Sequence, residues 1–144
     1  MDTHESPARL RCLTSWLLMQ AAQRAGRLAA GRMATLGVSK ATYPALATLS
    51  EFGPSSQAEL GRRLGIDRKD VSALAVELEL TGVVKRSADP EDMRRNRLAI
   101  TAEGRALLRR LDAAFAGLQE DLLAGLSAEE RAVLARLLSV ISSP

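Results

Sequence analysis

The sequence feature that most constrains the fold is a run of four short patterned segments in residues 56–101. The first two carry apolar residues at helical spacing. The first starts with Ser56, which matches a capping box with Glu59, and ends at Gly65. The second starts with the N-cap Asp67 and ends at Gly82. The next two are short strand patterns joined by a charged loop. In order, we expect helices at 56–64 and 68–81 and strands at 83–87 and 97–101. A helix, a turn, a second helix and a hairpin form a winged helix-turn-helix.

Long helical patterns flank this winged segment, which we place at residues 36–101. The first, residues 8–34, is apolar on more than one face, which is typical of a helix with more than one packing neighbour. In a chain this small, that neighbour can be a second subunit. The long flanking helices are expected at 8–34, 102–124 and 128–142, and Thr101 caps the second of these. A further helix, capped by Ser39, is expected at 40–52 within the winged segment. Apolar residues expected to be buried include Ala58, Val133, Leu134, Leu137, Leu138 and Ile141.

The predicted fold is therefore mainly α with a minor β part. It is a single domain, residues 1–144, in which a winged helix-turn-helix with a two-stranded wing lies between long N- and C-terminal helices. The residues are 47% hydrophobic and 26% charged, as in a soluble globular protein. The polar start MDTHESPARL and the absence of a long apolar stretch predict no secretory signal, no membrane span and a cytoplasmic location.

The scarcity of chemically reactive residues excludes several function classes. The chain has one Cys, Cys12, and one His, His4, whereas a zinc site needs three or four ligands. Aromatic residues make up only 3%, too few for a platform that stacks single-stranded nucleic acid. An enzyme would need Cys12 and His4 as nucleophile and base, with no third group to orient them. We expect no metal, no cofactor and no enzymatic activity.

Basic residues are clustered, although the net charge is only +3. Residues 54–101 hold nine Lys and Arg against eight Asp and Glu, so local clusters must bind any nucleic acid. The clusters are Arg62, Arg63, Arg68 and Lys69, and then Lys85, Arg86, Arg94, Arg95 and Arg97. A helix fits the major groove and hairpin arginines fit the minor groove, which favours double-stranded DNA as the partner.

The hairpin also carries a specific motif. Asp92-Met93-Arg94 is followed by five residues, then by Ile100-Thr101 and Gly104, and this pattern resembles the wing signature of the MarR family. Matching upstream segments are Gln57-Ala58-Glu59-Leu60, Leu64-Gly65-Ile66, Val71-Ser72, Leu78-Glu79 and Gly82-Val83-Val84-Lys85-Arg86. The resemblance implies a homodimeric transcriptional regulator, usually a repressor. Such a dimer joins through its terminal helices, here 8–34 and 102–142, and binds a pseudo-palindromic operator.

The resemblance also implies which residues contact DNA. Arg94 enters the minor groove and Asp92 holds the wing arginines, although a solvated charge run is the simpler interpretation of both. Ala73 stands where many relatives have a basic or polar residue, so guanine readout falls to Arg68 or Lys69. The full set of candidates is Ser56, Gln57, Arg68, Lys69, Ser72, Ala73, Arg94, Arg95 and Arg97. The alternative to DNA contact is a purely capping role for Ser56 and a solvated surface position for Arg97.

The signal that such a regulator would sense is open. The family commonly holds a small aromatic or phenolic ligand between its dimer helices and winged region. The candidate ligand contacts in this chain are Trp16, Met19 and Tyr43, with His4. For each of them, packing in the core is the alternative interpretation. Some relatives instead sense peroxide through a Cys early in the first helix, the position of Cys12. For Cys12 the sequence favours an ordinary buried thiol, and a redox role is the alternative. A winged-helix interaction module without DNA binding also stays open.

Overall fold

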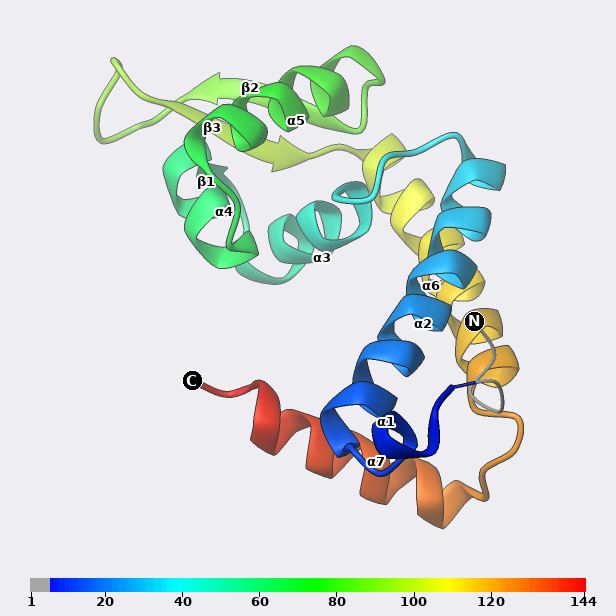
Figure 1. The fold of residues 1–144 in the computed structure, drawn as a ribbon. Coiled ribbons are helices and arrows are strands. Elements are labelled where there is room, and N and C mark those ends of the chain that lie inside the picture. Colours follow the sequence, from blue (N-terminus) through cyan, green and yellow to red (C-terminus); the bar gives the residue numbers. More distant parts are fainter. Residues whose placement is uncertain (1–5) are drawn as a thin grey trace. The chain divides into compact units, whose positions relative to one another are not determined.

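The computed structural model of the chain describes residues 6–144 (Figure 1). Its elements before the helix-turn-helix are α1 (Ala8–Arg11), α2 (Thr14–Leu36), α3 (Thr42–Phe52) and β1 (Ser55–Ser56). They are followed by α4 (Gln57–Leu64), α5 (Arg68–Leu80), β2 (Val84–Ala88), β3 (Asn96–Ile100), α6 (Ala102–Leu122) and α7 (Ala128–Ser142). The chain divides into two compact units: a winged unit, Met33–Ala113, and a terminal unit formed by the residues on either side of it.

The core of the winged unit lies where α3, α4 and α5 meet an antiparallel sheet of order β1-β3-β2. Leu98, in the central strand β3, is fully buried between Ser55 on one side and Arg86 on the other. The fully buried leucines of α3, α4 and α5 are Leu46, Leu49, Leu60 and Leu78. Burying each such side chain stabilises the fold by about 1.5–3 kcal/mol. This core fixes α4 and α5 against the hairpin.

Local capping sets the ends of the helix-turn-helix. Ser56 and Glu59 form a reciprocal capping box at the start of α4, and Asp67 accepts a backbone N–H from the first turn of α5. Gly65 has φ +67° and Gly82 has φ +76°, so both adopt left-handed conformations that favour glycine. The structure confirms the predicted capping box, the Asp67 N-cap and the two glycine stops.

Thr101 and Gly104 join the hairpin to α6. The Thr101 hydroxyl donates to the Gly82 carbonyl at 2.6 Å and accepts the Gly104 N–H at 3.0 Å, which confirms Thr101 as the cap. The Thr101 N–H donates to the Val83 carbonyl at 3.1 Å. Gly104 is buried, and a Cβ there would collide with the same Val83 carbonyl. The first turn of α6 therefore lies directly against the chain that enters β2.

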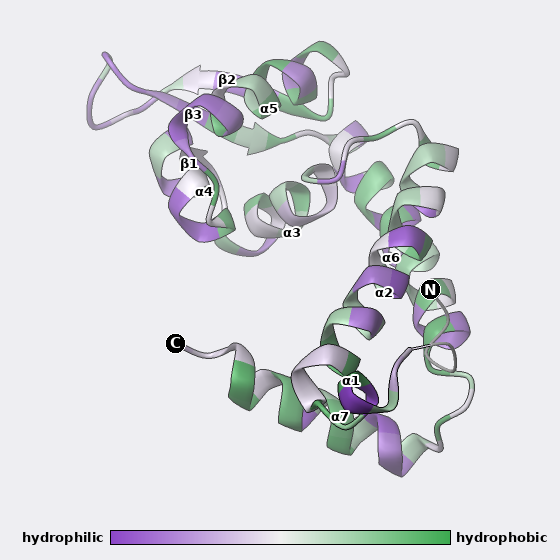
Figure 2. Ribbon diagram, in the orientation of Figure 1, coloured by the Kyte–Doolittle hydropathy of each residue, from purple (hydrophilic) through white to green (hydrophobic). Residues whose placement is uncertain are grey.

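The terminal unit is held by polar contacts and leaves much apolar surface exposed. Arg24 donates to the main-chain carbonyls of Asp121 and Leu122, and Arg32 forms an ion pair with Asp121. Hydrophobic residues recur along α7 (Figure 2). The large exposed hydrophobic residues of this unit are Leu13, Leu17, Leu18, Met19, Val133, Leu137, Val140 and Ile141. The unit thus presents apolar side chains that its own described residues do not cover.

Several predicted features of the helices and sheet are wrong in detail. The helix expected at 8–34 is interrupted at Cys12, which is the C-cap of the short α1. Helix α3 begins at Thr42, after Ala41 and without a side-chain cap, so Ser39 does not cap it. The sheet has a third strand, β1, beside the predicted pair, because residues 55–56 form a ladder with β3.

Burial also differs from the expectation for two helices. In α7 no residue is buried, and Val133, Leu137 and Ile141 are each about half exposed or more. Ala58 of α4 is exposed as well. The helical periodicity correctly marks an apolar face, but the described chain does not supply the surface that would cover it. Among the described residues, no helix has both the length and the apolar character to cross a membrane.

Candidate nucleic-acid interface

Helix α5 buries one face and presents a polar one. Its buried residues are Val71, Leu74, Ala75 and Leu78. Its exposed residues include Arg68, Lys69, Ser72 and Ala73. The helical period separates these two sets, so the core that holds the helix leaves its N-terminal polar side chains outward. In the described part of the chain, neither Arg68 nor Lys69 forms an ion pair.

A groove of about 710 Å³ lies between α4 and α5. Its lining includes Arg62, Arg68 and the hydroxyl-bearing Ser72. Guanidinium and hydroxyl groups are the side chains that bind phosphate oxygens. Ala58 also lines the groove, which explains why it is exposed rather than buried. The groove therefore offers positive charge and donors next to the exposed start of α5.

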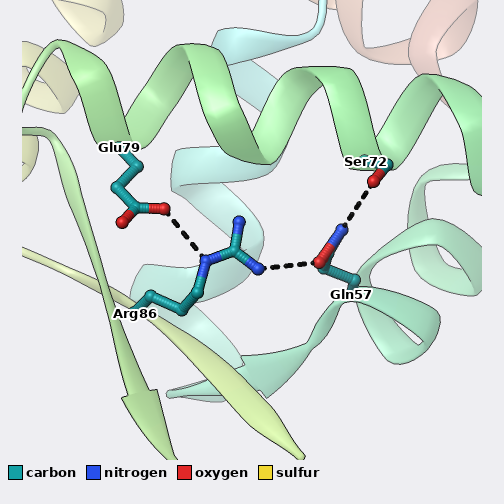
Figure 3. A network of polar contacts seen from close by, with 4 residues as sticks. All are labelled: Gln57, Ser72, Glu79 and Arg86. Atoms are coloured by element: carbon teal, nitrogen blue, oxygen red, sulfur yellow. Dashed lines mark hydrogen bonds and ion pairs between the residues drawn. The ribbon is translucent and has the colours of Figure 1, made fainter.

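Two of the predicted contact residues are engaged in a polar network (Figure 3). Gln57, half-buried at the start of α4, donates its amide N–H to Ser72 Oγ at 3.4 Å. Its amide oxygen accepts a hydrogen bond from Arg86 Nη1 at 2.9 Å, and Arg86 Nε donates to Glu79 at 2.9 Å. The sequence predicts no role for Glu79, and Arg86 is predicted there only as part of a basic cluster and of a matching segment.

Asp92 orders the loop of the wing. One of its carboxylate oxygens accepts the Arg94 N–H at 3.0 Å, and the other lies 3.7 Å from Arg95 Nε. The loop is closed by a hydrogen bond from the Asp89 N–H to the Arg95 carbonyl at 2.8 Å. The Arg94 side chain is exposed and forms no ion pair within the described residues. The loop is largely hydrophilic (Figure 2), so the turn presents a free guanidinium to solvent.

Two other arginines make contacts that the sequence did not predict. Half-buried Arg97 donates to the Pro54 carbonyl at 3.0 Å, which ties the wing to the segment before α4. The Arg63 guanidinium lies 3.9 Å from the centre of the exposed Phe52 ring. Both partners are distant in sequence or on another helix, so periodicity alone carries no signal for them.

The candidate ligand residues are divided between the two units. Trp16 and Met19 lie on α2 in the terminal unit, and Tyr43 lies on α3 in the winged unit. Met19 is exposed, and Trp16 is half-buried. The Trp16 Nε1 atom is buried and has no hydrogen-bond partner among the described residues. Trp16 therefore carries a buried donor to which a bound acceptor could bond.

The single tyrosine has a perturbed titration. Its hydroxyl donates to Asp112 at 2.6 Å. Burial, together with this hydrogen bond and the charge of Asp112, raises the pKa of Tyr43 to about 12. Each of these effects favours the neutral phenol over the phenolate. At neutral pH, Tyr43 is therefore a hydrogen-bond donor that is already engaged.

The predicted thiol differs from expectation in its exposure. Cys12 is exposed at the C-cap of α1, so it is not the buried thiol that the sequence favoured. Trp16 lies four residues further along the chain, on α2, beyond the break that separates it from Cys12. His4 lies outside the described residues. Within those residues, no cluster of three or more potential metal ligands occurs.

A helix-turn-helix followed by a hairpin, with exposed cations on its second helix and in the hairpin loop, defines the winged helix-turn-helix class of DNA-binding proteins. Residues 36–95 match the MarR family. The chain is also 31% identical over 121 residues to a putative transcriptional regulatory protein for the hcr operon of Thauera aromatica, covering 80% of this chain and 73% of that protein. The chain belongs to the MarR family of transcriptional regulators.

Other known proteins agree with this assignment. The transcriptional repressor NicR of Pseudomonas putida is 31% identical over 96 residues, and the match covers 67% of this chain but only 61% of NicR. A probable transcriptional regulator from Pseudomonas aeruginosa has a similar structure, with TM-score 0.81, 34% identity, and 92% and 98% of the two chains covered. PcaV from Streptomyces coelicolor, solved with its natural ligand, has TM-score 0.76, 26% identity, and 95% and 96% covered.

Proposed function

We propose that the chain is a homodimeric repressor that binds a pseudo-palindromic operator and releases it when a small aromatic ligand binds. The observation that carries the DNA contact is the set of free cations on two elements of the winged unit. Arg68 and Lys69 begin α5, and Arg94 lies in the wing loop. A major-groove helix and a minor-groove hairpin use cations at these two places.

Each half of the interface has a defined task in this proposal. Arg68, Lys69, Ser72 and Ala73 face the bases and phosphates of the major groove, and Ser56 binds phosphate through the start of α4. Arg94 enters the minor groove, while Asp92 fixes the turn beside it. Arg95 and Arg97 approach the phosphates. Ala73 offers only a methyl contact, which suits thymine rather than guanine.

The exposed apolar residues of α2 and α7 support dimerisation. Leu17 and Leu18 of α2 and Leu137 and Ile141 of α7 are each at least 39% exposed. Large apolar side chains exposed together on the same helices are typical of an interaction site. A second copy of the chain is the partner that a palindromic operator requires, because a two-fold protein matches a two-fold site.

The proposed ligand is a small aromatic acid or phenol. The buried Trp16 Nε1 donor supports an acceptor such as a carboxylate oxygen, and Trp16, Met19 and Tyr43 are the candidate contacts. The structure of PcaV with its natural ligand supports a small-molecule input for a protein of this kind. The second candidate input is peroxide, which the exposure of Cys12 favours because a sensing thiol must be reachable.

The experiment uses Trp16, the single tryptophan of the chain. Its fluorescence is followed while salicylate, benzoate or peroxide is added, and binding to DNA upstream of the protein's own gene is measured in parallel. We expect an aromatic acid to change the fluorescence and to release the DNA, with no effect of peroxide. DNA release by peroxide alone would instead identify the thiol mechanism. Absence of DNA binding at low salt would contradict the proposed regulator function. The remaining interpretation would then be a winged-helix protein-interaction module.

A further inference from the structure

Arg86 lies where the wing meets the helix-turn-helix, and its side chain links two helices. From β2 it donates to Glu79 of α5 and to Gln57 of α4, and Gln57 passes the connection to Ser72 of α5 (Figure 3). Only 24% of the Arg86 side chain is exposed. Partly buried, charge-assisted hydrogen bonds are stronger and better defined in geometry than surface ion pairs.

The orientation of Arg86 follows from the pleat of the sheet. Successive residues of a strand face opposite sides, so Arg86 shares a face with Val84, which is 2% exposed. Its neighbour across the sheet is Leu98, which is fully buried. Lys85 and Ser87 on either side are exposed. Arg86 therefore lies on the side of the sheet that faces the helices, unlike the cations of the wing loop.

These contacts hold helix α5 at two points. Ser72 and Glu79 are seven residues apart on α5, which is two turns and about 10 Å along the same side of the helix. Contacts at two points this far apart resist both rotation of the helix about its axis and sliding along it. Base readout depends on side chains held to within about 0.5 Å, so this restraint bears directly on selectivity.

We propose that Arg86 is a positioning residue for operator recognition. It holds α5 at a fixed rotation and depth relative to α4 and the wing, with Glu79 and Gln57 as its anchors, and it does not itself neutralise a phosphate. The inference rests on the proposed DNA-binding function. Gln57 then acts through its side chain on Ser72, rather than as the DNA contact that the resemblance implied.

Glu79 allows a test in which two explanations predict opposite signs. Electrostatics alone predicts that removing a negative charge from a DNA-binding helix tightens binding to DNA. Positioning predicts that Glu79→Gln weakens binding to the operator, because Arg86 loses its anchor on α5. Glu77→Gln is the matched control: Glu77 is exposed on the same helix, and its carboxylate has no hydrogen bond or ion pair among the described residues.

The experiment measures the dissociation constants of the full-length protein for two DNA duplexes over a range of salt concentrations. One duplex covers the region upstream of the protein's own gene, and the other has the same base composition in shuffled order. For Glu79→Gln we expect about fivefold weaker binding to the first duplex, which corresponds to about 1 kcal/mol. Binding to the shuffled duplex, the salt slope and the melting temperature should stay near wild type.

Arg86→Gln separates positioning from phosphate contact. Positioning predicts an unchanged salt slope, and no further weakening when Glu79→Gln is added. A slope reduced by about one would identify a phosphate contact and overturn the inference. If Glu79→Gln bound the operator as tightly as Glu77→Gln, the positioning inference would also be overturned. The proposed function would still stand in that case, provided that the wild-type protein bound the upstream duplex. If the wild-type protein bound neither duplex at low salt, the proposed function itself would fail.

Discussion

Gly104 is the position where a single methyl group should cost most for its size. A Cβ at Gly104 would lie 2.7 Å from Ile100 Cγ1 and even closer to the Val83 carbonyl oxygen. That oxygen is part of the backbone and accepts the Thr101 N–H at 3.1 Å, so it cannot move without lengthening this bond. The first turn of α6 must therefore shift away from the hairpin root.

The magnitude follows from three contributions. Overpacking of this kind costs about 1–3 kcal/mol, and weakening the Thr101 hydrogen bond adds about 1 kcal/mol. The better helix propensity of alanine returns about 1 kcal/mol. For Gly104→Ala we therefore expect a net loss of about 1–3 kcal/mol in the free energy of unfolding, and a fall of about 3–10 °C in Tm for a chain of this size.

Urea unfolding followed by circular dichroism measures this change. Gly61→Ala is the control, because Gly61 is also a buried helical glycine of the winged unit, but a Cβ there would meet its nearest atoms at an ordinary 3.4 Å. The control should match the wild type or gain up to about 1 kcal/mol. Equal stability of Gly104→Ala and wild type would refute the close approach of α6 to Val83.

Three further predictions concern the sites themselves. Arg94→Ala should weaken operator binding by about 1–3 kcal/mol without lowering Tm, and unchanged affinity in fluorescence anisotropy would remove the wing from the interface. The pKa of Tyr43 is raised to about 12 in the folded state. The contribution of this group to the free energy of unfolding is therefore fully present below pH 10 and is lost as pH rises toward 12. The absorbance of this single tyrosine should titrate near pH 12, and at a lower pH in Asp112→Asn, which leaves only the effect of burial; a wild-type midpoint near 10 would contradict the hydrogen bond to Asp112. In the presence of peroxide, Cys12→Ser should bind DNA as the wild type does. If peroxide instead released the wild-type protein from DNA and this substitution abolished the release, the protein would be a thiol sensor.

Local sequence signals predicted the helix-turn-helix well because its boundaries depend on near neighbours. The Ser56–Glu59 capping box, the Asp67 N-cap and the left-handed Gly65 each act within one turn of the chain. The apolar periodicity of α5 likewise predicted which of its residues are buried. Such features need no knowledge of the rest of the fold.

Features that depend on distant partners could not be predicted. The strand β1 is two serines long and exists only because β3 lies beside it. The contact between Arg86 and Gln57 joins residues 29 positions apart, so no local pattern marks it. In α7 the periodicity indicates an apolar face, yet it does not say which molecule covers that face. For the candidate site, the exposed cations were predictable, and the network formed by Gln57, Ser72, Glu79 and Arg86 was not.

The most direct test of DNA recognition by α5 and the wing is the salt dependence of operator affinity. Anisotropy of a labelled duplex from the upstream region is measured across salt concentrations, with a shuffled duplex as competitor. We predict that the logarithm of the affinity falls linearly with the logarithm of the salt concentration, with a slope corresponding to several released counterions, and that the upstream duplex binds at least about 1000-fold more tightly than the shuffled one. Equal affinity for both duplexes, or an affinity independent of salt, would contradict recognition of an operator through these residues.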